Sequence, residues 1–180
     1  MRGSALFALT AEHPIDVVTP SSSAEYKLVR ELLVEFMEWD AERVAALGLD
    51  ADLMKEFYYD QGVLNVPGAY GPPTGHLLLA MAAGHGAGCG AYCAAGSDIC
   101  ELKRVYVRSA YRGRKLGHRL VQMLMGEARS AGYRLMRLET VTFMKSAISM
   151  YQELGFQECP AYYEIPAEFR DVTMFMQRTL

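Results

Sequence analysis

The order of apolar and polar residues at the start of the chain predicts a strand followed by two helices. Ile15 to Thr19 is a short run with β-branched residues, and the serines after its closing proline supply N-caps for a helix. In that helix Leu28, Leu32 and Phe36 recur in steps of four residues, which predicts one apolar stripe against a core. A second helix is predicted from about Asp50 to Tyr59.

A stretch rich in glycine and proline separates these helices from a pair of strand patterns. Asn65 to Gly75 is predicted to be a loop because most of its residues favour turns. His76 to Met81 and Ala87 to Cys93 are predicted strands. A turn at Gly84 to Gly86 would join them in a hairpin.

The second half of the chain alternates strands with helices. Glu101 to Val107 is a predicted strand, and a basic loop, Arg108 to Lys115, leads from it into a helix that ends at Gly132. The apolar face of that helix consists of Leu116, Leu120, Leu124 and Ala128. Three further elements are predicted after it: a strand over Arg134 to Thr140, a helix over Lys145 to Leu154 closed by Gly155, and a strand over Val172 to Gln177. This order predicts one α/β domain over residues 1–180, built around a mixed sheet.

Composition and charge narrow the class of protein. Hydrophobic residues at 51% and charged residues at 22% are typical of a folded globular protein. The formal net charge of -3 argues against a broad basic surface for nucleic acid, so any anion site must be local. The charged residues between Tyr26 and Arg43 are predicted to form a solvated helix face. Met1 to Thr10 is too short for a membrane span and a poor signal peptide, so we expect a cytoplasmic protein with no membrane partner.

The cysteines and histidines do not predict a metal site. A chain of this size builds its own core, so the four cysteines, among them Cys100 and Cys159, are interpreted as small buried apolar side chains rather than disulfides. A zinc site would have to combine His76 and His85 with Cys89 and Cys93, whose spacing fits no familiar structural site; we therefore expect no metal.

The loop from Arg112 to Gly117 has the chemistry of an anion site. It lies between a predicted strand and a predicted helix, where the first helical N–H groups lack acceptors and the helix dipole is positive. Gly113 and Gly117 allow the backbone to approach a ligand closely. The loop therefore predicts a phosphate site.

This loop resembles the acetyl-CoA pyrophosphate motif of the GNAT superfamily of N-acetyltransferases. The motif is Arg or Gln, two variable residues, Gly, one variable residue, then Gly or Ala; Arg112 and Gly117 match its ends, and Lys115 replaces the middle glycine. The segment from Ser146 to Phe156 is similar to the superfamily's later helix, with Tyr151 followed by Gly-Phe. The resemblance covers roughly residues 100–156, with weaker similarity at 160–163.

The resemblance implies both a fold and an activity. The fold is a single domain with a mixed, mostly antiparallel central sheet flanked by helices, whose splayed central strands bind acyl-CoA. The activity is transfer of the acetyl group of acetyl-CoA, the acyl-donor cosubstrate, to a primary amine of a small molecule or peptide by direct attack. The N-terminal half would supply the acceptor site, and a homodimer is a family-level expectation. The alternative is a non-catalytic acyl-CoA-binding regulatory module.

Two residues take catalytic roles by this resemblance. Tyr151 corresponds to the general acid that protonates the departing thiolate, and Glu101 to the carboxylate that deprotonates the amine. Tyr151 has the alternative of a core tyrosine whose hydroxyl bonds the backbone. Glu101 has the alternative of a strand-end carboxylate paired with Lys103, Arg104 or Arg137.

The predicted cofactor contacts follow the same motif. Val105 and Val107 would bond the pantetheine arm through their backbone, and Arg112, Arg114 and Lys115 would contact phosphate unless they are only solvated loop residues. The full set of predicted cofactor residues is Val105, Tyr106, Val107, Arg112, Gly113, Arg114, Lys115, Leu116, Gly117 and His118.

One cofactor contact of the family is not matched by this sequence. Met144 stands where many relatives have an Asn, so the cofactor arm there would rest on backbone and packing.

The acceptor site is less defined by the sequence. Glu35, Trp39, Tyr58 and Tyr59 are candidates for an acceptor pocket for a cationic amine, with surface and core roles as the alternative.

Overall fold

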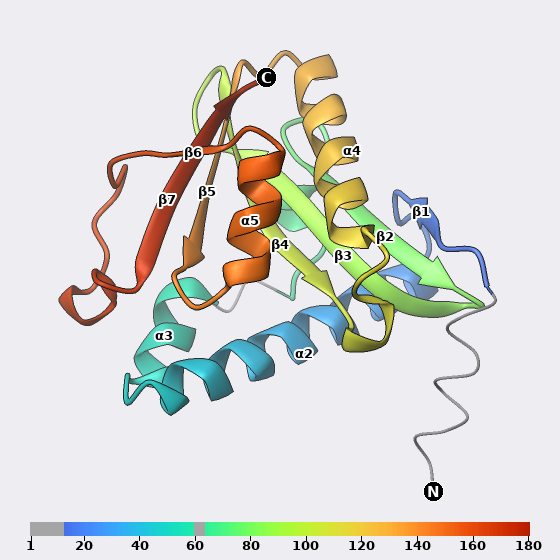
Figure 1. The fold of residues 1–180 in the computed structure, drawn as a ribbon. Helices are drawn as coiled ribbons and strands as arrows, with labels where there is room; N and C mark the ends of the chain where they lie inside the picture. Colours follow the sequence, from blue (N-terminus) through green and yellow to red (C-terminus); the bar gives the residue numbers. More distant parts are fainter. Residues whose placement is uncertain (1–12, 60–63) are drawn as a thin grey trace, which may run out of the picture.

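The computed structural model describes residues 13–59 and 64–180, and these residues fold around one seven-stranded sheet in the order β1-β2-β3-β4-β5-β7-β6 (Figure 1). The β4 and β5 strands pair in parallel, and every other neighbouring pair is antiparallel. The predicted mixed and mostly antiparallel sheet is therefore confirmed. The strands are β1 Asp16–Val18, β2 His76–Ala82, β3 His85–Ala94, β4 Ile99–Val107, β5 Leu135–Val141, β6 Gln157–Glu158 and β7 Thr173–Thr179.

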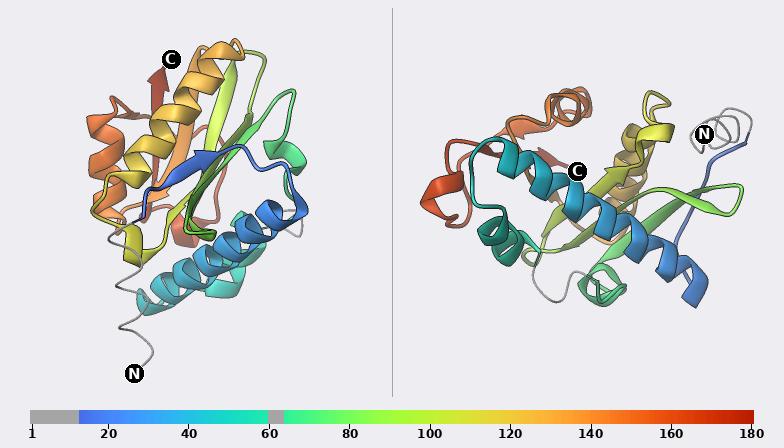
Figure 2. Two further views of the ribbon diagram at one scale, coloured as in Figure 1. Left: turned by 90° about the vertical axis from the view of Figure 1, so that its right-hand side faces the viewer. Right: turned by 90° about the horizontal axis from the view of Figure 1, so that it is seen from below.

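Helices cover both faces of the sheet (Figures 1 and 2). On one face α2 crosses the strands and α3 packs against its C-terminal half, whereas α4 and α5 lie on the other face. The helices are α2 Ser23–Ala46, α3 Ala51–Tyr58, α4 Leu116–Ser130 and α5 Lys145–Glu153, with 3-10 turns at η1 Gly68–Tyr70, η2 Ser109–Tyr111 and η3 Ala167–Phe169. None of the helices in the described part of the chain has the length and apolar composition that a membrane crossing requires.

Strand β2 shows how the sequence separates the two faces. Leu78 and Ala80 pack into the core beneath α4, and the alternate residues Leu77 and Leu79 pack against α2. Successive side chains on a strand point to opposite faces, so an almost continuous apolar run fills two cores.

The predicted elements are present, with shifts of a few residues at their ends. Ser22 caps α2 and forms a capping box with Glu25, as the serines before that helix suggested. Gly132 and Gly155 follow α4 and α5 with positive φ, which confirms both as helix terminators. The hairpin turn is tighter than predicted, because β3 already begins at His85. Strand β6 and the 3-10 turns were missed, since each is too short to show a period.

The cysteines were predicted to be unpaired and buried, and the structure agrees with this only in part. All four cysteines are free, but only Cys89 and Cys100 are buried, whereas Cys93 and Cys159 are half-buried. Cys93, near the end of β3, and Cys159, just after β6, are thus closer to solvent than predicted. The segment Met1 to Thr10 lies outside the described residues.

The central strands β4 and β5 separate from each other halfway along their length. Their pairing runs from Ile99 and Leu135 only as far as Glu101 and Arg137. Opposite Gly90 of β3, strand β4 contains one extra residue, and Arg104 in this bulge has a left-handed φ of 60°. Such a bulge bends its strand, so the far half of β4 leaves β5 and a gap opens between them. The predicted splay of the central strands is confirmed.

Candidate functional site

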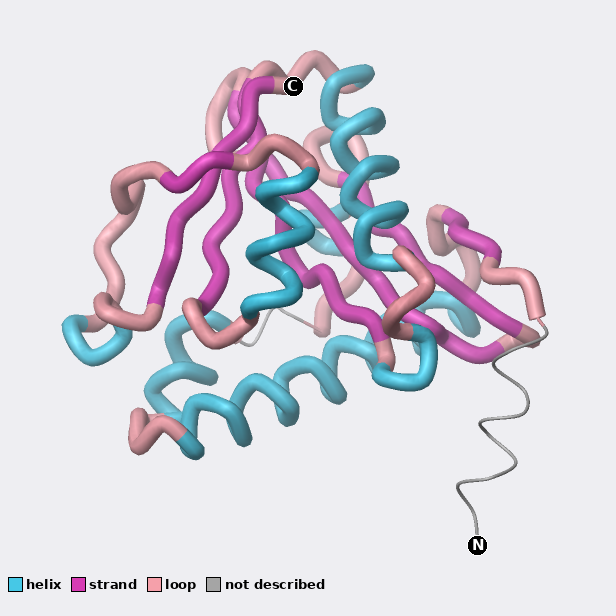
Figure 3. The backbone as a smooth tube through the Cα atoms, viewed as in Figure 1, coloured by secondary structure: helices cyan, strands magenta, loops and turns pink. Residues whose placement is uncertain are grey.

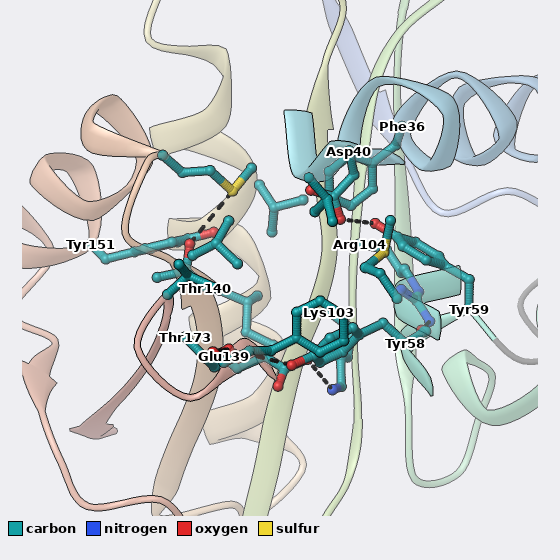
Figure 4. Close-up of a pocket in the computed structure, with 18 residues that line it drawn as sticks. Phe36, Asp40, Tyr58, Tyr59, Lys103, Arg104, Glu139, Thr140, Tyr151 and Thr173 are labelled. Atoms are coloured by element: carbon teal, nitrogen blue, oxygen red, sulfur yellow. Dashed lines mark hydrogen bonds and ion pairs between the residues drawn. The ribbon is translucent and has the colours of Figure 1, made fainter. Parts of the chain in front are cut away.

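The gap between β4 and β5 contains a cavity of about 100 Å³ (Figure 4). Because the sheet is open here, side chains from both of its faces reach the same space. Tyr151 of α5 and Leu102 of β4 belong to the core beneath α4 and α5, whereas Phe36, Tyr58 and Tyr59 come from the opposite face. The polar and charged residues of the cavity wall are Asp40, Tyr58, Tyr59, Lys103, Arg104, Glu139, Thr140, Tyr151 and Thr173.

Glu139 supplies a carboxylate to this cavity from β5. Burial raises the pKa of Glu139 to about 7, although the nearby Lys103 ammonium acts in the opposite direction. Lys103 Nζ lies 3.7 Å from one carboxylate oxygen, and the Tyr163 hydroxyl donates a hydrogen bond to the other. A carboxylate with a pKa near neutrality can take up and release a proton under physiological conditions.

Glu101 lies on β4 next to this group, but it is not part of the cavity wall. Its carboxylate pairs with Lys103 Nζ at 3.0 Å and accepts a hydrogen bond from the Tyr162 hydroxyl at 2.9 Å. Lys103 thus bridges Glu101 and Glu139. The pairing of Glu101 with Lys103 is one of the alternatives that the sequence left open.

Arg104 occupies the bulge of β4 and joins it to the helical side of the cavity. Its Nε donates to the Tyr70 hydroxyl at 3.1 Å, and its Nη2 donates to the Tyr58 carbonyl oxygen at 2.9 Å. The guanidinium also lies over the Tyr59 ring, 4.7 Å from its centroid. These contacts hold a residue whose backbone conformation costs roughly 1–2 kcal/mol for an L-amino acid.

Asp40 is a second carboxylate in the cavity wall, contributed by α2. Its Oδ2 accepts a hydrogen bond from the Tyr59 hydroxyl at 2.9 Å, but its buried Oδ1 receives no hydrogen bond from the described residues. Burial raises the pKa of Asp40, and the Tyr59 hydrogen bond opposes that rise. The prediction that the charged residues of this helix form a solvated face is therefore wrong for Asp40, because α2 turns that position toward the gap in the sheet.

Tyr151 reaches the cavity from α5, on the opposite side from Asp40 (Figure 4). The side chain is 7% exposed, and burial raises the pKa of its phenol, so the hydroxyl remains protonated at neutral pH. Among the residues that the structure describes, none forms a hydrogen bond with this hydroxyl. The alternative of a core tyrosine tied to the backbone is therefore not supported, and the O–H remains available to a ligand.

The basic loop leads from β4 through η2 into the N-terminus of α4 (Figure 3). Arg119 N–H donates to the Lys115 carbonyl oxygen at 3.0 Å, so the earlier N–H groups of Leu116, Gly117 and His118 have no acceptor within the helix. No side chain caps this helix start. These N–H groups therefore form a free donor set at the positive end of the helix dipole.

Lys115 stands in the backbone conformation that suits the glycine it replaces. It is the N-cap of α4 and has a φ of 57°. Gly113, two residues earlier, also has a positive φ, of 75°. The loop thus keeps the motif's turn although one of its glycines is a lysine.

The remaining loop residues fix how closely α4 packs. Leu116 is buried in the core, and a Cβ on Gly117 would lie 3.2 Å from Met150 Sδ of α5. The side chains of Arg112 and Arg114 are exposed, and His118 is half-buried.

Arg112 makes contacts that the sequence did not suggest. Its Nε donates to the Val107 carbonyl oxygen at 2.9 Å, and its guanidinium lies 5.7 Å from the centroid of the Trp39 ring. Arg114 Nη2 donates to the His13 carbonyl oxygen at 3.4 Å. Arg112 therefore braces the loop against β4 and α2.

The predicted cofactor residues of β4 follow the edge of the gap. Val105 lines the cavity, whereas Tyr106 points to the other face and stacks on Phe36 with centroids 5.4 Å apart. The edge of β4 that faces β5 beyond Glu101 has no strand partner. Apart from the Val107 carbonyl oxygen, which accepts from Arg112 Nε, its backbone groups are thus open to an extended ligand with amides of its own, as the pantetheine arm has.

Comparison with known families decides what this arrangement represents. The Acetyltransferase (GNAT) family profile matches residues 27–156. The chain belongs to the GNAT family. As a GNAT acetyltransferase it uses acetyl-CoA as its acyl donor, and the gap in the sheet, the free N–H groups of α4 and the open edge of β4 fit that molecule. Among the described residues, no cluster of histidine, cysteine and carboxylate side chains suits a metal ion.

Relatives and solved structures agree with this assignment. An uncharacterized N-acetyltransferase of Schizosaccharomyces pombe is 33% identical over 156 residues, which cover 83% of this chain and 85% of the relative. The PaiA N-acetyltransferase of Thermoplasma acidophilum, solved with coenzyme A, has the same fold, with a TM-score of 0.69, 18% identity, and coverage of 93% of this chain and 99% of the other. An acetyltransferase of Streptococcus agalactiae gives a TM-score of 0.72 at 18% identity, with coverage of 92% and 98%. The family and the named relatives favour an enzyme over the non-catalytic alternative.

In this GNAT protein, two of the four candidate acceptor residues line the cavity and two do not. Tyr58 and Tyr59 line the cavity, as one alternative held. Glu35 instead pairs with Arg108, whose Nε donates to Glu35 Oε2 at 2.8 Å, and Trp39 contacts the guanidinium of Arg112.

Two residues of the cavity wall were not predicted as functional from the sequence. Glu139 and Asp40 stand on a strand and a helix whose patterns gave no sign of a polar cavity. Glu139 lies between the apolar Leu138 and the polar Thr140, a pattern that an ordinary half-exposed strand also shows, so no local signal marked it.

Proposed function

We propose that this GNAT protein acetylates a primary amine of a small molecule or peptide by direct attack of the amine on acetyl-CoA within the cavity between β4 and β5. The observation that carries the proposal is that Glu139 and Tyr151, a carboxylate with a pKa of about 7 and a protonated phenol without a partner, line that one cavity. Such a pair meets the need for one group that accepts a proton and another that donates one.

The residues of the cavity perform the proton transfers. Acetyl-CoA, when bound, supplies the thioester whose acetyl carbon is attacked. Glu139 takes a proton from the incoming ammonium, which frees the nitrogen lone pair to form the new C–N bond. As the C–S bond breaks, its electron pair goes to sulfur, and the Tyr151 hydroxyl gives that sulfur its proton. The nitrogen loses its second proton as the amide forms, and this proton restores the phenol.

Glu139 is a better placed base than Glu101, the carboxylate that the resemblance indicated. Glu139 lines the cavity, whereas Glu101 is held by Lys103 and Tyr162 outside its wall. A base must reach the proton that it removes, directly or through one water molecule. We therefore assign Glu139 as the base, and Glu101 as the group that holds Lys103 in position.

The N-terminus of α4 is our proposed site for the pyrophosphate. The free N–H groups of Leu116, Gly117 and His118 supply hydrogen bonds, and the exposed cations of Arg114 and Lys115 add positive charge to the loop around Gly113. Arg112 supports this loop through Val107. The pantetheine arm follows Val105 and Val107 along the open edge of β4.

The cavity wall supports an acceptor that inserts a narrow amine-bearing group. A cavity of about 100 Å³ is large enough to admit an aminoalkyl chain or a peptide's terminal residue. Phe36, Tyr58 and Tyr59 supply aromatic surface, and Asp40 offers an unused hydrogen-bond acceptor to an N–H donor. A homodimer and a cytoplasmic location remain predictions from the sequence.

The test is acceptor-dependent release of CoA thiol from acetyl-CoA over a panel of small amines and short peptides. We expect release with at least one acceptor, and Glu139→Gln is expected to lower kcat/KM by about 10²–10⁴ at pH 7.5 while the acetyl-CoA affinity measured by calorimetry is unchanged. Glu164→Gln, which removes an exposed carboxylate, is the matched control. Binding of acetyl-CoA without turnover with any amine would contradict the proposal, and wild-type turnover of Glu139→Gln would remove that residue from it.

A further inference from the structure

Two adjacent tyrosines hold the two carboxylates on either side of Lys103. The Tyr163 hydroxyl donates to Glu139 Oε2, and the Tyr162 hydroxyl donates to Glu101 Oε1 at 2.9 Å. Both tyrosines belong to the segment between β6 and β7, which runs along the edge of the sheet formed by these two strands (Figure 1). A single loop thus contacts both candidate bases.

We propose that Tyr163 is a positioning residue that sets the orientation and proton affinity of Glu139, while Tyr162 does the same only for Glu101. The proposal rests on the assignment of Glu139 as the base. It gives a role to two residues that lie outside the cavity wall and that the reaction itself does not use.

The rings of both tyrosines are anchored, so their hydroxyls cannot move freely. The centroids of Tyr162 and Tyr163 lie 4.8 and 5.2 Å from that of Phe175 on β7 and 5.2 Å from each other. The Arg137 guanidinium lies 4.9 Å from the centroid of the Tyr162 ring. Edge-to-face contacts of this kind favour one arrangement of the rings. The hydroxyl positions are therefore set by the packing on β7.

Both oxygens of Glu139 are engaged by different groups. Oε1 faces Lys103 Nζ at 3.7 Å, and Oε2 accepts the hydrogen bond from Tyr163. With the two oxygens held on opposite sides, the carboxylate plane is defined relative to the cavity. A base held in one orientation keeps the geometry that proton transfer needs.

The Tyr163 hydrogen bond also favours the charged form of Glu139. Burial raises the pKa of Glu139 to about 7, and Lys103 opposes that rise. A hydroxyl that donates to the charged carboxylate, as the Tyr163 hydroxyl does, acts in the same direction as Lys103. Loss of the donor is therefore expected to raise the pKa further. The titratable and charged groups around Glu139 are Glu101, Lys103 and Arg104 of β4, Tyr58 and Tyr59 at the end of α3, and Tyr162 and Tyr163 of the loop.

Tyr162→Phe and Tyr163→Phe form a matched pair for the test. Each removes one hydroxyl from the same loop and leaves the ring on Phe175. Since a donated hydrogen bond stabilises the charged carboxylate, Tyr163→Phe should raise the pKa of Glu139 by about one to two pH units. Tyr162→Phe leaves both donors of Glu139 in place and acts on it only through Glu101, so it should shift that pKa much less.

The first measurement is the pH dependence of kcat/KM for the wild type and both variants. Tyr163→Phe should move the acidic limb to higher pH by about one to two units and recover activity at alkaline pH. A merely structural defect would lower the rate at every pH. A shift in Tyr162→Phe instead would show that Glu101 is the base and would overturn the proposal, as would the same shift in both variants or in neither.

The second measurement needs no acetyl-CoA and no turnover. The carboxyl of Glu139 can be titrated by NMR in protein labelled with ¹³C at the glutamate carboxyl, with Glu139→Gln used to assign its signal. An upward shift of the Glu139 pKa in Tyr163→Phe alone supports the positioning role, and an unchanged pKa refutes it. If no amine is acetylated, the proposed function fails, and this titration still decides whether Tyr163 holds Glu139.

Discussion

Tyr151 and Asp40 line the same cavity although they stand on helices that cover opposite faces of the sheet. A continuous sheet would separate them with a layer of hydrogen-bonded backbone. Here the pairing of β4 with β5 ends at Glu101, so the two faces meet through the gap. The sides that we propose for the cofactor and for the acceptor therefore share one space, which is our proposed place of acyl transfer.

Tyr151→Phe should reduce activity without reducing stability. Its hydroxyl has no hydrogen-bond partner in the described part of the chain, so no internal bond is lost, whereas loss of a general acid should lower kcat by about 10²–10⁴. Thiol release and urea unfolding measure the two effects. The control is Tyr133→Phe, which loses a hydrogen bond to the Thr74 carbonyl at 2.8 Å and should cost about 1 kcal/mol of stability but no activity. Near wild-type turnover in Tyr151→Phe would leave that residue a packing role only.

Glu139→Gln should make the protein's stability less sensitive to alkaline pH. The pKa of Glu139 is raised from 4.5 to about 7 on folding, so the folded state binds the extra proton between these values and its stability falls as pH rises through them. From pH 5 to pH 8 this single group should cost the wild type roughly 2–3 kcal/mol, a loss that the glutamine variant avoids.

Urea unfolding of wild type and Glu139→Gln at pH 5 and pH 8 measures this difference. Glu164→Gln serves as the control, because it removes an exposed carboxylate from the same region. Equal pH dependence of wild type and Glu139→Gln would show that Glu139 does not titrate in this range.

Lys115→Gly should stabilise the protein by about 0.5–1 kcal/mol. Lys115 has a φ of 57°, a conformation that costs an L-residue about 1–2 kcal/mol and glycine little, while the extra chain entropy of glycine offsets part of the gain. Lys115→Ala loses the same charge but keeps the Cβ, so it should give no such gain. Equal stabilities for the two variants in urea unfolding would assign the effect to charge rather than to the backbone.

Two glycines of α4 should respond differently to alanine. Gly126 has open space around its missing Cβ, so Gly126→Ala should raise the free energy of unfolding by roughly 0.5–1 kcal/mol through helix propensity. A Cβ on Gly117 would meet Met150 Sδ at 3.2 Å, so Gly117→Ala should gain less or lose stability. Thermal unfolding of both variants compares them, and an equal gain would mean that α4 and α5 do not pack closely at Gly117.

Local patterns explain why the elements of the fold were predictable. The serines before α2 and the glycines after α4 and α5 act within one turn of the helix, so their effect is visible in the sequence. The loop around Gly113 and Gly117 is equally local. The role of Tyr151 followed only from the resemblance of its motif, and it remains a proposal.

The choice between Glu101 and Glu139 depends on contacts that no local pattern contains. Both are acidic residues on neighbouring strands, and their positions relative to the cavity depend on strand register, on the bulge at Arg104 and on the loop that carries Tyr162 and Tyr163. Asp40 looked like one more residue of a charged helix face until α2 was placed against the gap.

By itself, the sequence determined the helices, every strand except β6 and the basic loop before α4, because these depend on side-chain periods and on turn residues a few positions apart. The tertiary structure alone decided which side chains share the cavity and that two carboxylates, those of Glu139 and Asp40, are buried there with raised pKa values. That outcome depends on how β4 separates from β5 and on which distant residues, such as Asp40 and Tyr163, the fold brings beside the opening.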